Sequence, residues 1–239
     1  MILVLKWYEL NEMKIVVFSP HPVDEIFGCG GSILKWIDES HDVHIVYVTD
    51  NRAFYSWGLK DNKINEEDAK EYSHLSGDEL GNIGLAEAKL VAKAFGFPEK
   101  NTHLFKFHDQ DAFNQIDNGI KLSKEIINDA DRIVLPSDNN NHPDHQATHT
   151  MAKRAALDLE LKDVEFYVYA IYNILKTPMK RQIKIRMGQY RNRIYELMKG
   201  YKTQLCLKET NLGWQTLKFR RAERFGIYKL QDANRFYNF

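Results

Sequence analysis

The sequence predicts an α/β protein, a Rossmann-like three-layer α/β/α sandwich with a mostly parallel sheet and a C-terminal strand and helix addition. Two observations lead to this prediction. Short apolar runs of strand length alternate with amphipathic segments of helical period through most of the chain. Two of these runs, at residues 14–18 and 132–136, end in clusters of polar side chains, at the point where open α/β sheets bind their ligands.

The expected elements can be placed from periodicity and from helix-end signals. Strands are expected at residues 14–19, 43–49, 102–107 and 132–136, and helices at 28–38, 85–95, 116–130 and 143–159. Gly96 is expected just past the end of the second helix, and Asn141 or His142 before the last. Pro143 suits the first position of that helix, where a missing N–H costs nothing. Each strand–helix–strand unit implies parallel pairing with a right-handed crossover.

Residues 52–84 are polar and show no clear period, so we expect either a functional lid or a disordered insertion. Its aromatic residues favour the lid, because a merely solvated loop would not need them. These residues are Phe54, Tyr55, Trp57 and Tyr72.

The pattern changes after residue 163. A strand is expected at 165–171 and a long helix at 182–205, which would form an antiparallel edge and a packing helix. The chain ends in an aromatic tail: Phe225, Tyr228, Phe236, Tyr237 and Phe239. We expect a single domain over residues 1–239, with a core at 14–160 and an addition at 161–239.

Composition narrows the function. The 239 residues contain 33 Lys plus Arg and 33 Asp plus Glu, so the overall charge gives no reason to expect nucleic acid as a partner. No run approaches the ~18 apolar residues that cross a bilayer, and residues 1–5 are expected to be an extension that docks on the body. Two cysteines, Cys29 and Cys206, fit a reducing compartment. A soluble, cytoplasmic protein is expected.

The two polar clusters indicate a metal site. His21 and Asp24 follow the first apolar run, and His142 and His145 follow the fourth. Each pattern is weak alone. Together, after two separate strands, they supply the two histidines and one carboxylate of a catalytic zinc, which keeps a position open for water. Such an ion lowers the pKa of its water and polarises a carbonyl, as amide hydrolysis requires.

The run His21-Pro22-Val23-Asp24-Glu25, followed by Gly28-Cys29-Gly30-Gly31, closely resembles the first motif of the LmbE/PIG-L zinc-dependent N-deacetylases, and His142-Pro143-Asp144-His145 is similar to their second. Weaker similarity continues along nearly the whole chain, through Glu87-Ala88, Gly96, Asp109, residues 199–204 and residues 223–225. The resemblance implies one divalent metal per chain, Zn²⁺, and an N-acetylated amino sugar or its conjugate as substrate.

The resemblance also implies roles for individual residues. His21, Asp24 and His145 would bind the metal. His142 would stabilise the oxyanion or protonate the leaving amine, and Asp144 would orient it. In the family an aspartate between the proline and the metal-binding aspartate is the general base. This chain has Val23 there, which accepts no proton.

Other carboxylates could take over the base role, which typically contributes ~10²–10⁴-fold to the rate. Glu25, Asp50 and Asp109 all lie at predicted strand ends. Glu25 is expected to be structural, accepting backbone N–H groups at the turn. Asp50 and Asp109 are kept as substitute bases or ligands of sugar hydroxyls. The family often carries an arginine where this chain has Gly84, which puts the binding of an anionic substrate group in doubt.

Three further patterns have simpler explanations. His149 stands four residues after His145, a spacing that can hold zinc, but it is expected to be packed or exposed one turn into the helix. The glycines at 28–31 do not match the Gly-x-Gly-x-x-Gly of a nucleotide-binding turn. Residues 176–193 contain seven basic and no acidic residues, and a solvated face or an oligomer contact is preferred over a nucleic-acid patch.

The sequence therefore predicts a zinc-dependent hydrolase that removes an acetyl group from an amino sugar, with a small-molecule partner and no nucleic acid. Because of Val23, the alternative is a metal-binding relative that hydrolyses weakly or not at all and serves as a sugar-binding or scaffold protein. A nucleotide-dependent enzyme is the third and least favoured interpretation. A homo-oligomer is left open.

Overall fold

The computed structural model describes residues 12–171 and 173–232. Within these residues, seven strands form one sheet in the order β3-β2-β1-β4-β5-β7-β6. The first five run parallel, and β7 is antiparallel to both β5 and β6. The strands are β1 (Lys14–Ser19), β2 (Asp42–Thr49), β3 (Thr102–Phe107), β4 (Arg132–Pro136), β5 (Glu165–Tyr169), β6 (Gln182–Arg186) and β7 (Ala222–Lys229).

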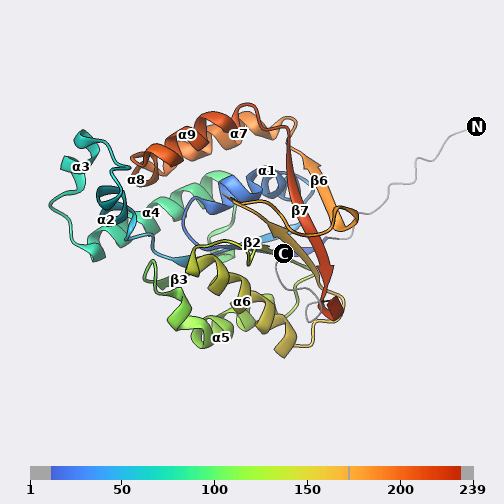
Figure 1. The fold of residues 1–239 in the computed structure, drawn as a ribbon. Coiled ribbons are helices and arrows are strands. Elements are labelled where there is room, and N and C mark those ends of the chain that lie inside the picture. Colours follow the sequence, from blue (N-terminus) through green and yellow to red (C-terminus); the bar gives the residue numbers. More distant parts are fainter. Residues whose placement is uncertain (1–11, 172, 233–239) are drawn as a thin grey trace, which may run out of the picture.

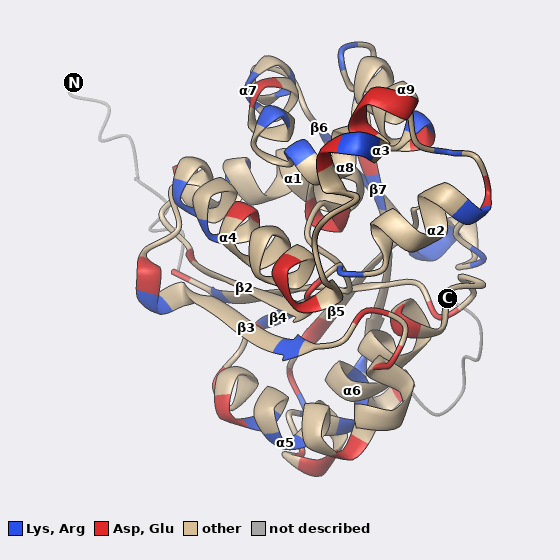
Figure 2. Ribbon diagram, turned by 90° about the vertical axis from the view of Figure 1, so that its left-hand side faces the viewer, with Lys and Arg blue, Asp and Glu red and all other residues tan. Residues whose placement is uncertain are grey.

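Helices cover both faces of the sheet, which confirms the predicted three-layer sandwich (Figure 1). One layer contains α1 (Asp24–Asp38), α4 (Gly77–Phe95), α7 (Tyr190–Leu197) and α9 (Lys208–Leu217), and the other contains α5 (Ile116–Ile127) and α6 (Pro143–Asp158). Figure 2 shows the same layers from the side, with both signs of charge on α5. In the described part of the chain, no helix is both long and apolar enough to cross a lipid bilayer.

The alternation of side chains along β1 explains why two helical layers are needed. Ile15 and Val17 belong to one apolar cluster with α1 and α4, whereas Val16 and Phe18 belong to a second cluster with α5 and α6. Since every one of these side chains is fully buried, the strand is apolar on both faces, as parallel sheets require.

Residues 52–84 form helices, so the expectation of a disordered insertion was wrong. They form α2 (Phe54–Lys60), α3 (Glu66–Tyr72) and the first turns of α4, which begins at Gly77 and not at residue 85. Ser76 and Glu79 form a reciprocal capping box at that start. The segment packs through a small apolar cluster of its own onto α8 (Lys202–Leu205) and the start of α9.

The C-terminal region differs from the expected long helix over 182–205. Gln182–Arg186 is strand β6, because its alternating isoleucines have the period of a strand, and Gly188 at φ +43° turns the chain before α7. The strand expected at 165–171 as an antiparallel edge is β5, which pairs parallel with β4 inside the sheet. The antiparallel strands are β6 and β7, and β7 contains Phe225 and Tyr228. The rest of the aromatic tail and residues 1–5 lie outside the described residues.

Helix α1 is kinked at Cys29, and its first half carries the Asp24 of the motif. The kink frees the amides of Gly31 and Ser32, and Glu223 from β7 accepts both, at 2.8 and 2.7 Å. A side chain at Gly28 would meet the ring of Tyr169 at 2.4 Å. These contacts fix the start of α1 against the sheet and so place the motif residues.

Candidate metal centre and its cavity

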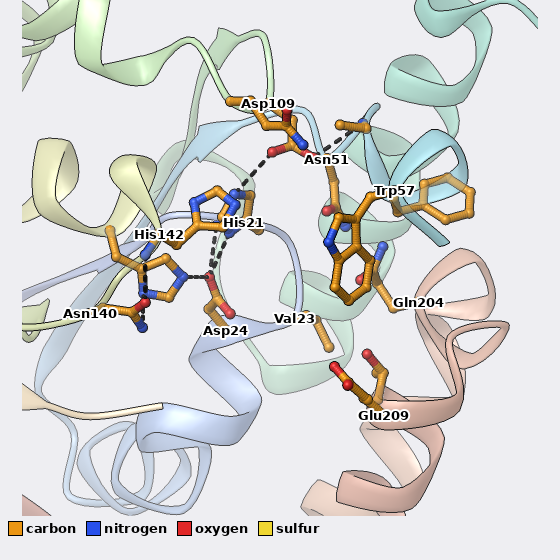
Figure 3. Close-up of a pocket in the computed structure, with 15 residues that line it drawn as sticks. His21, Val23, Asp24, Asn51, Trp57, Asp109, Asn140, His142, Gln204 and Glu209 are labelled. Atoms are coloured by element: carbon orange, nitrogen blue, oxygen red, sulfur yellow. Dashed lines mark hydrogen bonds and ion pairs between the residues drawn. The ribbon is translucent and has the colours of Figure 1, made fainter. Parts of the chain in front are cut away.

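The predicted site residues meet at the carboxyl ends of the parallel strands, as Figure 3 shows. His21 follows β1, Asp109 follows β3, and His142 and His145 lie at the start of α6, just after β4. Asp24 is the first residue of α1. Parallel strands bring their carboxyl ends to one edge, so residues more than a hundred positions apart come into contact.

Three of these residues converge on one point. Oδ2 of Asp24 lies 3.0 Å from Nδ1 of His21 and 3.3 Å from Nε2 of His145, and it also accepts the backbone N–H of His21. All three side chains are buried. Asn140 approaches the other ring nitrogen of His145, with its Nδ2 3.3 Å from Nδ1.

This donor set fits a divalent metal. The donor atoms of His21, Asp24 and His145 all lie within 4.8 Å of one another. Ligand atoms of a tetrahedral zinc, with bonds of about 2.0–2.2 Å, stand about 3.3–3.5 Å apart. The observed separations of 3.0 and 3.3 Å are close to that spacing. Two imidazoles and one carboxylate also leave the fourth position free for water.

The pKa shifts of His21 and Asp24 both favour a positive charge at this site. Burial raises the pKa of Asp24, but His145 and His21 outweigh it and hold that pKa well below its usual range. Burial lowers the pKa of His21, but Asp109, Asp144 and Asp24 together raise that pKa well above its usual value. A metal ion bound here would take the place of the proton that these carboxylates favour on His21.

The second nitrogen of His21 is oriented by carboxylates. Its Nε2 lies 3.2 Å from Oδ1 of Asp109 and 3.2 Å from Oδ2 of Asp144. Asp144 is fixed in turn by the backbone N–H groups of Gln110 and Ala112, at 2.7 and 3.1 Å. With Nε2 protonated toward these carboxylates, Nδ1 presents its lone pair to the metal position.

His142 is the N-cap of α6, and its Nδ1 accepts the backbone N–H of Asp144 at 3.3 Å. Its ring stands edge-on to that of His21, with 4.7 Å between centroids. Burial and the neighbouring His21 lower the pKa of His142. A neutral ring with Nδ1 as acceptor carries its proton on Nε2, so His142 presents an N–H donor.

Val23, at the position where the sequence resemblance implies the general base, has a strained backbone. It lines the cavity with 4% of its surface exposed and has φ 113°, a left-handed conformation that is rare for a β-branched residue. Its N–H donates to Glu25, which also accepts the hydroxyls of Ser19 and Tyr201. Glu25 thus holds the turn, as expected. Burial raises its pKa to about 7.

Asp50 is directed away from the cavity. Its carboxylate accepts Nε–H of Arg52 at 2.8 Å and the backbone N–H of Asp109 at 3.2 Å, and it does not line the cavity. A Cβ at Gly84 would lie 2.6 Å from the Asp50 carbonyl oxygen, so no arginine could stand at that position. His149 is packed, with its Nδ1 2.8 Å from the carbonyl oxygen of Pro136.

The metal position opens into a cavity of about 260 Å³. Phe54 and Trp57 of the expected lid line it, whereas Tyr55 and Tyr72 pack within the lid cluster. The polar lining residues that sequence reasoning missed include Asn51, Gln110, Gln204 and Glu209. The strand-end position of Asn51 could have pointed to it. The last two lie on α8 and α9 and have no local signal.

Comparisons with known proteins agree on the fold. The sequence model of the family described as PIG-L, GlcNAc-PI de-N-acetylase, matches residues 16–156. A glucosamine-6-phosphate deaminase-like protein of Bacteroides thetaiotaomicron is 39% identical over 36 residues, which are 15% of this chain and only 5% of that protein.

Two solved structures show how widely this fold is used. N,N'-diacetylchitobiose deacetylase from Pyrococcus horikoshii has a TM-score of 0.69 at 18% identity, covering 93% of this chain and 86% of that one. GalB, the 4-carboxy-2-hydroxymuconate hydratase of Pseudomonas putida KT2440, has a TM-score of 0.60 at 14% identity, covering 90% and 95%. At these identities the likeness shows the fold, which carries more than one reaction.

Proposed function

This chain belongs to the PIG-L family of GlcNAc-PI de-N-acetylases, and from that premise we propose that it is a metal-dependent hydrolase that removes the acetyl group from an N-acetylated amino sugar or its conjugate. The convergence of His21, Asp24 and His145 on one point is the observation that carries the proposal. Since a hydratase shares the fold, the proposal rests on the family match and on these residues, not on the fold.

We assign the metal to His21, Asp24 and His145, and Zn²⁺ is the ion that best fits this nitrogen and oxygen donor set. When bound, such an ion activates water and polarises the acetyl carbonyl. The chain contributes the surroundings of that reaction. Asp109 and Asp144 hold His21 in one tautomer, and Phe54 and Trp57 supply apolar wall to the cavity.

We assign His142 the role of oxyanion donor. His142 lines the cavity, and because its Nδ1 accepts the Asp144 amide, Nε2 carries the proton and is the donor. A hydrogen bond from this group to the carbonyl oxygen strengthens as negative charge develops there, which is worth about 10²–10³ in rate for a well-placed donor. To protonate the leaving amine, His142 would first have to be an imidazolium. The Asp144 N–H opposes that state, because it donates to the Nδ1 that would then carry a proton.

The apolar side chain of Val23 cannot take the proton from water, so the native rate of hydrolysis is expected to be low. Asp109 remains the candidate substitute because it lines the cavity, whereas Asp50 is paired with Arg52. Val23 also favours a second function, that of a metal-binding relative which binds an amino sugar without efficient hydrolysis. Both functions need the same cavity and the same ligand class.

The decisive experiment measures amine release from N-acetylglucosamine and N,N'-diacetylchitobiose by zinc-loaded native protein, Val23→Asp and Val23→Asn. Asparagine matches aspartate in shape but accepts no proton. We expect slow release by the native protein and about 10²–10⁴-fold faster release by Val23→Asp alone. A silent native protein beside an active Val23→Asp would establish the binding function instead. No release by any zinc-loaded variant would refute the deacetylase proposal.

A further inference from the structure

Besides its histidines, the cavity is lined by acidic side chains but by no lysine or arginine of the described residues. Among its lining residues in the described chain, Asp24, Asp109 and Glu209 carry carboxylates, and none is lysine or arginine. Around His21 the carboxylates of Asp24, Asp109 and Asp144 have a formal charge of −3 at one charge each. That exceeds the +2 of one divalent ion, so the metal-loaded cavity still favours neutral or cationic ligands over anions.

Two cations beside lining residues, Arg52 next to Asn51 and Lys63 next to Glu209, are already paired with carboxylates. Arg52 pairs with Asp50 at 2.8 Å and with Asp78 at 2.7 Å. Lys63 lies 3.0 Å from Oε1 of Glu209, and its ammonium stands 4.1 Å from the centroid of the Trp57 ring. Neither residue lines the cavity. A phosphate group on the substrate would therefore find no free cation beside the sugar.

Glu209 lies at the end of the cavity opposite the histidines. In Figure 3 Val23 stands between Asp24 and Glu209, and Trp57 lies along the wall beside them. The Glu209 side chain is 57% exposed, so it sits at the rim, where α9 begins. At about 260 Å³ the cavity is small for a ligand site, and a second sugar unit would project past this rim.

We propose that Glu209 is a specificity-determining residue that selects saccharides whose neighbouring unit carries a free amine, a partly deacetylated amino-sugar oligomer, and that the cavity rejects sugars bearing phosphate. This inference rests on the proposed function, because it places the acetylated unit at the histidines. The ammonium of the next unit then reaches the Glu209 carboxylate, where it competes with Lys63.

The test compares ligand binding, which does not depend on turnover. Zinc-loaded native protein is titrated by calorimetry at about pH 6.5, where a sugar amine is protonated, with three probes. They are the mono-N-acetylated disaccharide of N-acetylglucosamine and glucosamine, N,N'-diacetylchitobiose and N-acetylglucosamine 6-phosphate. The same titrations are made with Glu209→Gln and with Glu196→Gln. Glu196 is a matched control, since it is 61% exposed and paired with Lys199 but lies outside the cavity.

We expect the amine-bearing disaccharide to bind best and the phosphate probe worst. Glu209→Gln should cut the preference for the amine over the diacetylated disaccharide about three- to fivefold, and more at low than at high salt, whereas Glu196→Gln should leave it unchanged. An unchanged preference in Glu209→Gln, or phosphate binding as tight as that of the neutral disaccharide, would overturn the inference.

The two proposals fail in different ways. If no acetylated sugar releases amine but the Glu209-dependent preference is present, the deacetylase proposal is wrong and the selectivity stands. If amine is released but N-acetylglucosamine 6-phosphate binds as well as the other probes, the selectivity is wrong and the deacetylase proposal stands. Circular dichroism of Glu209→Gln checks that the half-exposed substitution leaves the fold intact.

Discussion

Oδ2 of Asp24 lies 3.0 Å from Nδ1 of His21. His21 belongs to the turn after β1, and Asp24, three positions later, is the first residue of α1. The turn at residues 20–23 folds the imidazole back over the start of α1. His145, from a helix on the other face of the sheet, then approaches the same oxygen. Two imidazoles directed at one carboxylate oxygen are a reason to expect an ion between them.

We predict about one zinc per chain by elemental analysis of the native protein. Asp24→Asn and His145→Ala should lose the metal, whereas His74→Ala, an exposed histidine of the lid, should keep it. Zinc at a hundredfold excess over its Kd stabilises by about 2.7 kcal/mol, which is a rise in Tm of roughly 5–10 °C for a chain of this size. Full metal content in His145→Ala would contradict the assignment.

Because the backbone of Val23 is strained, we predict that glycine at this position gives a more stable protein than alanine, the reverse of the usual order. Both substitutions remove the buried side chain, and glycine normally costs about 0.5–1 kcal/mol more than alanine. At φ 113° alanine keeps the strain, whereas glycine relieves it. We expect Val23→Gly to be more stable than Val23→Ala by about 1 kcal/mol in urea unfolding.

Val91 provides the control for this comparison. It is buried in the middle of α4, with ordinary helical geometry, so Val91→Gly should be the less stable of its pair. If alanine is the more stable substitution at both positions, the left-handed conformation of residue 23 is not maintained in solution.

Because Glu25 is buried, we predict that its contribution to the free energy of unfolding falls as pH rises. Burial raises its folded pKa to about 7, against an ordinary value of 4.5, so between these values the folded state binds the extra proton. Below 4.5 both states are protonated and the contribution is complete. Above about 7 both are ionised, and roughly 3 kcal/mol has been lost.

The variant that isolates this effect is Glu25→Gln. Its amide oxygen can accept from Ser19 and Val23, and its amide group can donate to Tyr201, so the brace is retained without a charge. We expect the free energy of unfolding of the metal-free variant to gain on that of the metal-free native protein between pH 5 and 8. A constant difference across this range would show that Glu25 ionises normally.

Much of the sandwich could be predicted from the sequence, for a physical reason. Strands buried on both faces are continuous apolar runs, and β1 and β4 have the bounds that those runs indicate. The half-buried edge strand β3 also has its expected bounds. The residues at the ends of parallel strands must meet, so the meeting of His21 with His145 also followed from the sequence. Helix α1 was expected to begin four residues late, because its kink and glycines hide the first turn.

The lid and the second half of the cavity could not be predicted, because their order depends on distant contacts. Helices α2 and α3 are seven residues each, too short to hold by propensity alone, and they are ordered by packing on Leu207. Glu209 reaches the cavity only because α9 lies over α1. No local pattern marks a residue whose position depends on such packing.

Trp57 gives the last prediction. Trp57 lines the cavity, and Lys63 stands over one face of its indole at 4.1 Å, so we expect a sugar ring to lie against the other face. We expect Trp57→Ala to raise KM for an amino-sugar substrate about tenfold, the equivalent of ~1.4 kcal/mol, with little change in kcat or zinc content. The KM of Trp57→Phe should lie between that of the native protein and that of Trp57→Ala. Leu59→Ala is the control, because Leu59 lies on the same helix and outside the cavity. A fall in kcat with unchanged KM would instead place Trp57 at the reacting end of the cavity.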